Sequence, residues 1–412
     1  MKILGLTSSF PLGNGNTDGS FIFDHFSHLK VVSDNEITVL CPHSRGAKFF
    51  EQKNGLNIYR FVYFYPYALE YLAYDEGLPY KIMNSSLAKI QVPLFITSEL
   101  IYSIVLIWQK NIDLINSHWL IPQGLVGSIC KKFFGITHIA TVHSSEVSVL
   151  KRIPLGKFLM SFIINHVDIL VSVSSHRSNE ILEFLPPILA ENAREKLRIV
   201  PMGTDIARNL NPQNKDAIKS KYGINSQYVV LFVGRLVEVK GCIFLLENFS
   251  RVVKEICSIK LLILGNGPLE PELKNYVSSQ GLQNNVMFMG FIEHDSMKDF
   301  YSIADIVVVP SIVDSYGYQE GLPVVVIESL SCGIPVIGTN TNGIAEAIID
   351  HHNGILVDPQ NSEQIAEAII NLLSNHDLRT SLSKNALVSA EKYHWDTVAG
   401  KYWIIFNEAA KR

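Results

Sequence analysis

The chain has 412 residues, which is enough for two domains, since single domains usually contain about 100–200 residues. Hydrophobic residues make up 47% of it and charged residues 18%, a globular composition that excludes general disorder. The formal net charge of −4 gives no overall basic surface for nucleic acid, so no nucleic-acid partner is expected.

The cysteines and the apolar stretches indicate a cytoplasmic protein. Five cysteines are scattered along the chain without a CxxC or Cys/His cluster, which favours reduced thiols and predicts no zinc site. The N-terminal MKILGLTSSFPLG has a very short apolar run, so a secretory signal is not expected. The most apolar stretch, residues 92–108, contains Glu99 and falls short of the ~20 residues that span a bilayer, which favours a buried helix.

Short runs rich in β-branched residues recur along the chain and alternate with segments of helical spacing. In chain order they read KILGLTS, EITVLCP, NIYRFVYF, IDLINSHW, THIATVHS, DILVSVSS, LRIVPMG, YVVLFVGRL, KLLILGNG, NVMFMGF, DIVVVPS, IPVIGTN and GILVDP. Several are continuous Val/Ile/Leu runs, which are typical of strands covered by helices on both faces of a parallel sheet. The alternation predicts an α/β fold of two doubly wound, Rossmann-like domains.

The polar, proline-containing residues 206–220 predict a linker between an N-terminal domain, residues 1–205, and a C-terminal domain, residues 221–392. Open α/β sheets bind ligands beyond the carboxyl ends of their strands. A cleft between two such domains is a usual place for a site. Candidate site residues should therefore follow strands directly, in both halves of the chain.

The first candidate motif is FVGRLVEVKG, residues 232–241, where a strand ends at a turn formed by Gly234 and Arg235, with Lys240 a few residues later. A guanidinium and an ammonium group at a strand's end can hold a diphosphate, because one offers a planar fork of donors and the other a compact charge. Two ordinary surface cations are the alternative interpretation.

Three more strand ends carry candidate residues. LGNGPLEPEL begins its turn at Gly265 but lacks the full dinucleotide fingerprint, which disfavours a dehydrogenase. FPLGNGNTDGSF, residues 10–21, is rich in Gly and Asn, so its N–H groups can cradle an anion, although an ordinary surface loop reads the same way. TVHSSEV places His143 at a strand's carboxyl end, which favours a functional role over a structural one.

The stretch QEGLPVVVIES places Glu320 and Glu328 on either side of an apolar run. The run has strand propensity, but a strand has just ended, a proline stands at its start and a glycine follows its end. We therefore expect a short buried helix at residues 324–332, whose N-terminus favours phosphate. Both carboxylates would then face one ligand and accept hydrogen bonds from the vicinal hydroxyls of a ribose or a hexose.

The region PSIVDSYGYQEGLPVVVIESLSCGIPVIGTNTNGIAEAI resembles the E-x7-E signature of retaining GT-B glycosyltransferases of family GT4. GRLVEVKG resembles that family's phosphate-binding turn, while SHWLIPQGLVG, TVHSSEV and VPMGTD resemble its N-domain and linker patterns. The resemblance runs from the first strand to the last helix, and it implies two Rossmann-like domains facing across a cleft. It also implies that residues 393–412 form a helix that packs back toward the N-terminal domain.

The resemblance implies an activity as well. It is the transfer of a hexosyl group, with retention, from a UDP- or GDP-linked diphosphate sugar to a hydroxyl of a sugar or lipid-linked acceptor, in surface-polysaccharide biosynthesis. Glu328 would hold the nucleotide ribose. Glu320, together with the main-chain N–H groups of Gly321 and Leu322, would contact the hydroxyls of the donor sugar. Family members of this kind need neither a metal nor a cofactor.

The remaining roles follow from the same resemblance. Arg235 and Lys240 would bind and neutralise the diphosphate, and Gly19 would approach the phosphates from the N-terminal domain. His143 would sit beneath the transferred sugar, and the strand end at Phe291 would meet the base through the backbone. The catalytic candidates are thus His143, Glu320, Arg235 and Lys240, and the turn glycines Gly234 and Gly265 join the donor-binding set.

Two positions depart from the family pattern. Ser144 follows His143 where the family often has glycine, and Asn342 precedes Gly343 where it often has two glycines. The first change makes the donor-sugar pocket slightly smaller, and the second touches the loop beside the phosphates. Neither removes a charge, so activity is expected to survive.

The acceptor side is the least patterned part of the chain. Residues 151–164 and 131–134 mix cations with aromatic and aliphatic residues, which is typical of peripheral contact with an anionic membrane, here at its cytoplasmic face. An amphipathic helix packed on its own sheet is the alternative. Two other functions stay open, namely a nucleotide-sugar epimerase of the same architecture and a catalytically silent nucleotide-binding subunit.

Overall fold

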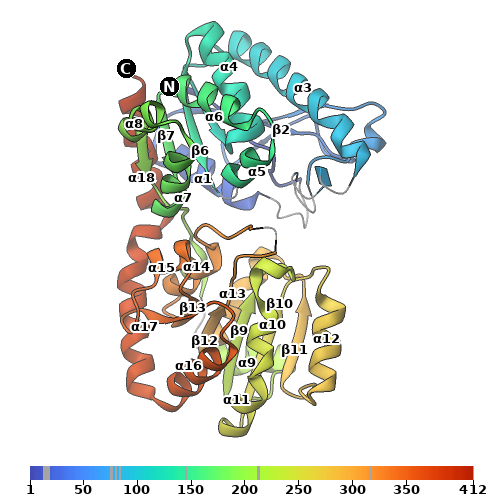
Figure 1. The fold of residues 1–412 in the computed structure, drawn as a ribbon, viewed down its shortest axis with the longest axis vertical. Coiled ribbons are helices and arrows are strands. Elements are labelled where there is room, and N and C mark those ends of the chain that lie inside the picture. The colour runs from blue at the N-terminus through green and yellow to red at the C-terminus, as the bar shows by residue number, and fades with distance from the viewer. Residues whose placement is uncertain are drawn as a thin grey trace. The chain divides into compact units, whose positions relative to one another are not determined.

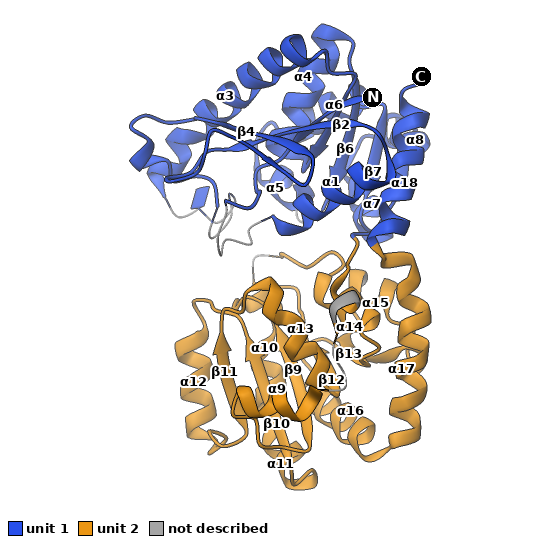
Figure 2. Cartoon of the chain, turned by 180° about the vertical axis from the view of Figure 1, so that it is seen from behind, with its two compact units in different colours: residues 1–202, 395–412 blue, residues 203–394 orange. Residues whose placement is uncertain are grey.

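The computed structural model describes residues 1–12, 19–74, 78, 81–82, 85–143, 146–210, 214–315 and 317–411. The chain, drawn in Figure 1, divides into two compact units, which Figure 2 shows in different colours. Unit 1 comprises Met1–Met202 and Trp395–Arg412, and unit 2 comprises Gly203–His394. The stretch expected to be a linker belongs to unit 2, where it contributes η3 (Ile206–Asn209) and α9 (Lys215–Lys221). That the two domains face each other across a cleft stays a prediction.

Unit 1 is built on an eight-stranded sheet in the order β3-β4-β2-β1-β5-β6-β7-β8. Among the described strands only β3 and β4 pair antiparallel. The strand order reverses around β1, which lies between β2 and β5. The strands are β1 (Lys2–Leu6), β2 (Glu36–Pro42), β3 (Phe50–Lys53), β4 (Leu56–Phe61), β5 (Leu114–His118), β6 (Thr137–Val142), β7 (Ile169–Ser172) and β8 (Leu197–Ile199).

Helices cover both faces of this sheet (Figure 1). They are α1 (Ser20–Val32), α3 (Ser86–Lys110), α4 (Leu125–Phe134), α5 (Glu146–Arg152), α6 (Gly156–Asn165), α7 (Ser175–Phe184), α8 (Pro187–Lys196) and α18 (Trp395–Ala409), with the short turns η1 (Tyr67–Leu69) and η2 (Leu120–Gly124). The last helix packs on α1, and the His28 ring stacks on the Trp395 ring at 5.8 Å between centroids. The C-terminal end of the chain is thereby part of the unit that contains its N-terminus.

The apolar stretch at residues 92–108 forms a helix, as expected, but the expectation that this helix is buried is wrong for most of its surface. The helix, α3 (Ser86–Lys110), has 25 residues. Ser85 caps its N-terminus, where its hydroxyl accepts the Ala88 N–H, and Asn111, in the left-handed conformation, caps its C-terminus. Among the described residues, α3 is the one helix whose length and apolar composition would allow it to cross a membrane. Only 33% of its most apolar stretch is buried in the protein. Its inner face packs on the sheet of unit 1, and its outer face is exposed.

Unit 2 is built on a six-stranded parallel sheet in the order β11-β10-β9-β12-β13-β14. The first strand, β9, lies between β10 and β12, so the strand order reverses there, and a ligand site is expected beyond the carboxyl ends of β9 and β12. The strands are β9 (Tyr228–Val233), β10 (Ile259–Leu264), β11 (Val286–Gly290), β12 (Ile306–Val309), β13 (Val336–Thr339) and β14 (Gly354–Val357).

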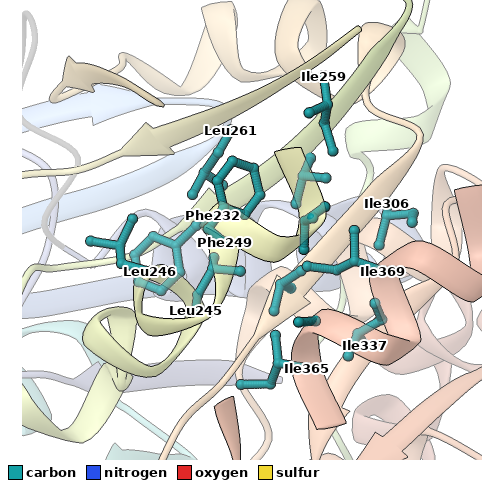
Figure 3. Close-up of a cluster of buried hydrophobic side chains, with 14 of the residues drawn as sticks. Phe232, Leu245, Leu246, Phe249, Ile259, Leu261, Ile306, Ile337, Ile365 and Ile369 are labelled. Atoms are coloured by element: carbon teal, nitrogen blue, oxygen red, sulfur yellow. The ribbon is translucent and has the colours of Figure 1, made fainter. Parts of the chain in front are cut away.

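The core of unit 2 forms where strands and covering helices bury continuous apolar runs against each other. Figure 3 shows Phe232, Leu261 and Ile306 from the strands packed with Phe249 and Ile369 from the helices. The helices of the unit, besides α9, are α10 (Cys242–Glu247), α11 (Phe249–Glu255), α12 (Glu270–Ser279), α13 (His294–Ile303), α14 (Val324–Ser331), α15 (Asn342–Ala347), α16 (Ser362–Ser374) and α17 (His376–Ala390), with the turns η5 (Glu238–Lys240) and η6 (Glu391–Tyr393).

The predicted α/β class is confirmed, and each predicted run contains a strand. The short helix expected around residues 324–332 is also confirmed as α14, with Pro323 at its N-cap and Gly333 in the left-handed conformation just after its end. Strand propensity alone fails here, because the proline and the glycine delimit a helix whose β-branched side chains are buried. The sequence did not predict β3, a mostly exposed edge strand with the sequence FEQK.

Candidate functional site

Three turns at the carboxyl edge of the unit 2 sheet lie in a row after β9, β10 and β11. The Gly234 N–H donates to the Leu264 carbonyl at 2.9 Å, and the Gly265 N–H donates to the Gly290 carbonyl at 2.7 Å. Gly265 has φ 125°, and a Cβ on it would lie 2.0 Å from the Gly234 carbonyl oxygen, so only glycine fits there. Phe291 follows Gly290, and its ring is 54% exposed. The structure therefore brings three of the predicted donor-binding positions to one edge.

Lys240 and Glu320 join the loops that follow β9 and β12. The Lys240 ammonium forms an ion pair with one Glu320 carboxylate oxygen, and the Ser311 hydroxyl donates to the other at 2.5 Å. Gly241, in the left-handed conformation, holds the Lys240 turn against the β12 loop, since a Cβ on it would lie 1.9 Å from the Pro310 carbonyl oxygen. The sequence predicts Lys240 and Glu320 separately and does not predict that they pair.

Glu328 has a different partner from Glu320. It lies on α14, and the Tyr301 hydroxyl of α13 donates to its Oε2 at 2.6 Å. Tyr301 is buried, and burial together with the Glu328 charge raises the pKa of its hydroxyl well above the ordinary value. The hydroxyl therefore stays protonated and fixes one oxygen of the carboxylate. That both glutamates face one ligand stays a prediction.

The other candidates of unit 2 lie beside this pair of loops. Gly321 is buried, and a Cβ on Gly343 would lie 1.6 Å from its carbonyl oxygen, so the loop after Glu320 rests against the start of α15. Leu322 is half-buried, and Arg235 is exposed at the turn after β9. Sequence reasoning missed Ser311 and Tyr301, because an isolated serine or tyrosine carries no pattern that distinguishes it from others.

Unit 1 holds the candidates Gly19 and His143 at the carboxyl edge of its own sheet. Gly19 caps α1 with φ 74°, and a Cβ on it would lie 2.3 Å from the Ser9 carbonyl oxygen. Phe21, two residues later, places its ring 5.4 Å from the His143 ring, which follows β6. The structure thus brings the start of α1 and His143 together, while residues 13–18 of the glycine-rich loop and Ser144 lie outside the described residues.

His143 belongs to a buried group of histidines that the sequence gave no reason to expect. Its Nε2 lies 2.9 Å from Nδ1 of His118, the last residue of β5, and the ring of His25 lies 5.0 Å from the His118 ring. Burial lowers the pKa of His25 and His143 to about 3, and it lowers the pKa of His118 well below its ordinary value. All three imidazoles are therefore uncharged near neutral pH, and His118 orients the His143 ring.

Chemically, the two units supply different groups. Unit 2 offers cations and carboxylates at a topological switch point, which suits a ligand with phosphates and hydroxyls. Unit 1 offers neutral imidazoles beside a helix start. Among the described residues, no group of three or more His, Cys, Asp or Glu side chains is placed to hold a metal ion.

The two doubly wound units have the GT-B fold of the solved structures that they resemble, and part of the chain matches a known family. Residues 214–388 match the family described as glycosyl transferases group 1. An uncharacterized glycosyltransferase of Methanocaldococcus jannaschii is 28% identical over 71% of this chain and 74% of its own length. The matched region covers most of unit 2, and the comparisons support a glycosyltransferase activity for the chain.

Two further comparisons cover nearly the whole chain. The GDP-mannose-dependent alpha-(1-6)-phosphatidylinositol monomannoside mannosyltransferase of Mycolicibacterium smegmatis is 24% identical over 98% of this chain and 94% of its own length. Sucrose-phosphate synthase from Thermosynechococcus elongatus has the same fold, with a TM-score of 0.76 and 19% identity over 99% of this chain and 98% of its own.

The buried histidines predict that unit 1 loses stability in acid. The folded unit keeps them neutral, whereas the unfolded chain binds a proton at each below about pH 6.5, so stability rises with pH between about 3 and 6.5. Each contributes roughly 1.4 kcal/mol per pH unit in that window. All four tryptophans of the sequence lie in unit 1, so urea unfolding followed by tryptophan fluorescence reports on this unit.

The measurement compares wild type with His25→Gln, for which we expect the pH dependence of the unfolding free energy to fall by about one proton. His376→Gln, at an exposed position in unit 2, is the control and should leave the fluorescence transition unchanged. An unaltered pH slope in His25→Gln would show that this imidazole is not kept neutral by the fold.

The contact between Gly343 and Gly321 predicts a strong effect of one methyl group. Gly343→Ala places a carbon against the Gly321 carbonyl and displaces the loop that carries Glu320. A shift of about 1 Å at a positioning loop can cost ~100-fold in rate. We expect at least a tenfold loss in kcat/KM for the donor, measured with the purified variant. Gly400→Ala is the control, because nothing lies within 4 Å of a Cβ there, and it should keep wild-type kinetics.

Proposed function

We propose that the chain is a group 1 hexosyltransferase of the GT4 type that retains the anomeric configuration. Its donor is a UDP- or GDP-linked diphosphate sugar, and its acceptor is a hydroxyl of a sugar or of a lipid-linked sugar. The observation that carries the proposal is the junction of Lys240, Glu320 and Ser311 at the switch point, beside the second glutamate of the E-x7-E pair. The mycolicibacterial relative, by its name, uses GDP-mannose and acts on a phosphatidylinositol glycoside, which supports a nucleotide-linked donor and a lipid-linked acceptor.

The donor is held mainly by unit 2. The Glu328 carboxylate, oriented by the Tyr301 hydroxyl, accepts hydrogen bonds from the ribose. The main chain at Phe291, at the end of β11, meets the base. Glu320 accepts hydrogen bonds from the hydroxyls of the donor sugar. The main-chain N–H groups of Gly321 and Leu322 donate hydrogen bonds to the same sugar.

The Lys240–Glu320 ion pair gives donor binding a physical logic. A diphosphate carries more charge than a carboxylate, so the Lys240 ammonium exchanges its Glu320 partner for phosphate oxygens when the donor binds. Glu320 is then released to accept hydrogen bonds from the sugar. Arg235, on the same turn, adds a second cation, while Gly234 and Gly265 allow the backbone to approach the phosphates. Gly19 approaches the same phosphates from unit 1.

In the reaction, the bond from the anomeric carbon to the diphosphate oxygen breaks, and a bond from the acceptor oxygen to that carbon forms on the same face. The acceptor proton passes to the departing phosphate oxygen. Negative charge grows on the diphosphate as the bond breaks, and Arg235 and Lys240 stabilise it more in the transition state than in the ground state. His143, neutral and held by His118, hydrogen-bonds to the transferred sugar near its C6 hydroxyl. The reaction needs neither a metal nor a cofactor, so chelators should not stop it.

We place the enzyme in surface-polysaccharide assembly, in the cytoplasm at the inner face of the plasma membrane.

An epimerase of the same architecture would use the same donor site. Donor hydrolysis distinguishes the two functions without a known acceptor. Incubation of UDP-glucose or GDP-mannose with the protein should release the nucleoside diphosphate and the α-anomer of the sugar, as followed by NMR. Release of the β-anomer would overturn retention, and conversion to an epimeric nucleotide sugar would establish the epimerase instead. Binding without any turnover would identify a silent subunit.

The assignment of the diphosphate to Arg235 and Lys240 is tested by kinetics of single variants. Removal of one preorganised electrostatic donor costs about 10²–10³-fold in turnover, and we expect that loss for Arg235→Ala and for Lys240→Ala. Lys274→Ala is the matched control, because this exposed lysine pairs with Glu270 on α12, away from the site. Full turnover in Lys240→Ala would reject the phosphate assignment.

A further inference from the structure

The outer face of α3 is mainly apolar, and the exposed Thr97 interrupts it near the middle. The exposed aliphatic and aromatic side chains recur at helical spacing, and the Trp108 side chain at the C-terminal end is 70% exposed. The stripe consists of Leu87, Ile90, Leu94, Ile101, Val105 and Trp108, and Tyr102 is also exposed. Soluble monomers rarely expose an apolar stripe of this kind, so a partner is expected to cover it.

The opposite face of α3 is fixed to unit 1 by specific contacts. Phe95 and Leu106 lie in the core, and Gln91 accepts N–H groups of the segment between β4 and α3 through its Oε1. Glu99 is the only acidic residue of α3, and it is buried and accepts from the Gln123 amide at 3.3 Å. Burial raises the pKa of its carboxyl to about 8. The helix therefore lies on the unit with one face bound, as an interfacial helix does, and does not stand free to span a bilayer.

The stripe continues onto the end of α4. The Trp108 ring lies 6.4 Å from the Phe134 ring, and the Phe133 side chain is 71% exposed. The Lys132 ammonium lies 6.0 Å from the Phe133 ring centroid and 5.4 Å from that of Phe162 on α6. We refer to Leu87, Ile90, Leu94, Ile101, Val105, Trp108, Lys132, Phe133 and Phe134 together as the α3–α4 surface.

The charges at this surface have one sign. The acidic residue of α3 is buried, α4 contains no acidic residue, and Lys89 and Lys132 are exposed. In an isologous contact with a second copy of the chain, the same lysines would face each other or uncharged groups. An anionic bilayer instead supplies negative charge for the lysines, hydrocarbon for the stripe and an interface for the tryptophan.

We propose that the α3–α4 surface binds the interface of an anionic phospholipid bilayer. Of the two segments that the sequence singles out for membrane contact, residues 131–134 belong to this surface. Residues 151–164 are not part of it. In that segment Met160, Ile163 and Ile164 are buried in the core of unit 1, while Leu155 and Phe158 are exposed. The inference adds a binding surface to the proposed function and rests on it only for the idea that the acceptor is linked to lipid.

Vesicle co-sedimentation of the full chain, without nucleotide or sugar, tests the proposal. We expect binding to phosphatidylcholine vesicles containing about a third phosphatidylglycerol, and weaker binding to pure phosphatidylcholine. Ile101→Ser with Val105→Ser and Trp108→Ser should lower the partition coefficient at least tenfold. Lys132→Ala should lower it about fivefold on anionic vesicles, and high salt should reduce that difference. The matched control is Val388→Ser with Ile404→Ser, at exposed positions on α17 and α18, and should bind as wild type.

Each other outcome is decisive. Absence of vesicle binding, or equal binding by wild type and the triple serine variant, overturns the proposal. An oligomer of the wild type that the triple variant dissolves, seen by light scattering without lipid, shows that a second copy covers the surface instead. Donor hydrolysis keeps this test separate from the proposed function. The triple variant should hydrolyse donor at the wild-type rate. If the wild type binds vesicles but never turns over a donor, the transferase mechanism is rejected and the membrane-binding surface is still supported.

Discussion

The ion pair between Lys240 and Glu320 is the contact on which the candidate donor site depends. Both side chains are mostly buried, with 20% and 17% of them exposed, and a charge in such surroundings needs a partner. The two loops meet because β9 and β12 are neighbours in the sheet, at the point where the strand order reverses. Ser311 and Gly241 then hold the two loops together. In the proposed function, the donor diphosphate competes with Glu320 for the lysine, and the released carboxylate then accepts hydrogen bonds from the sugar.

The ionisable side chains at the carboxyl edges of the two sheets differ in their surroundings. In unit 2, charged side chains at the sheet edge have charged or hydroxyl partners, since Lys240 pairs with Glu320 and Glu328 accepts from Tyr301. In unit 1, the histidines at the equivalent edge lose their charge because burial among aromatic rings disfavours the imidazolium. The aromatic neighbours come partly from α18, whose Tyr402 ring lies 4.3 Å from the His25 ring, so the end of the chain helps set the state of the histidines near its beginning.

The sequence predicts most of the fold because continuous Val/Ile/Leu runs and their turn residues determine the strands, and because a proline and a glycine delimit α14. It does not predict β3, since FEQK has no apolar run and pairs only along an exposed edge. Motif spacing locates Lys240 and Glu320, but nothing local in 80 residues of intervening chain shows that they pair. The histidine group is equally invisible, because its members come from α1, β5 and the loop after β6 and meet only in the folded sheet.

The case of α3 shows why apolar composition does not determine burial. The stretch contains enough hydrophobic residues for both faces, and polar side chains decide which face turns inward. Gln91 and Glu99 find hydrogen-bond partners elsewhere on the unit, whereas on the opposite face the Thr97 hydroxyl donates to the Pro93 carbonyl of the same helix. A helix free to cross a bilayer would leave those polar groups in hydrocarbon, at a cost of several kcal/mol each. The buried polar residues of α3 therefore hold it against the protein. Its apolar stripe, with lysines nearby, is the face that we propose to contact the lipid bilayer.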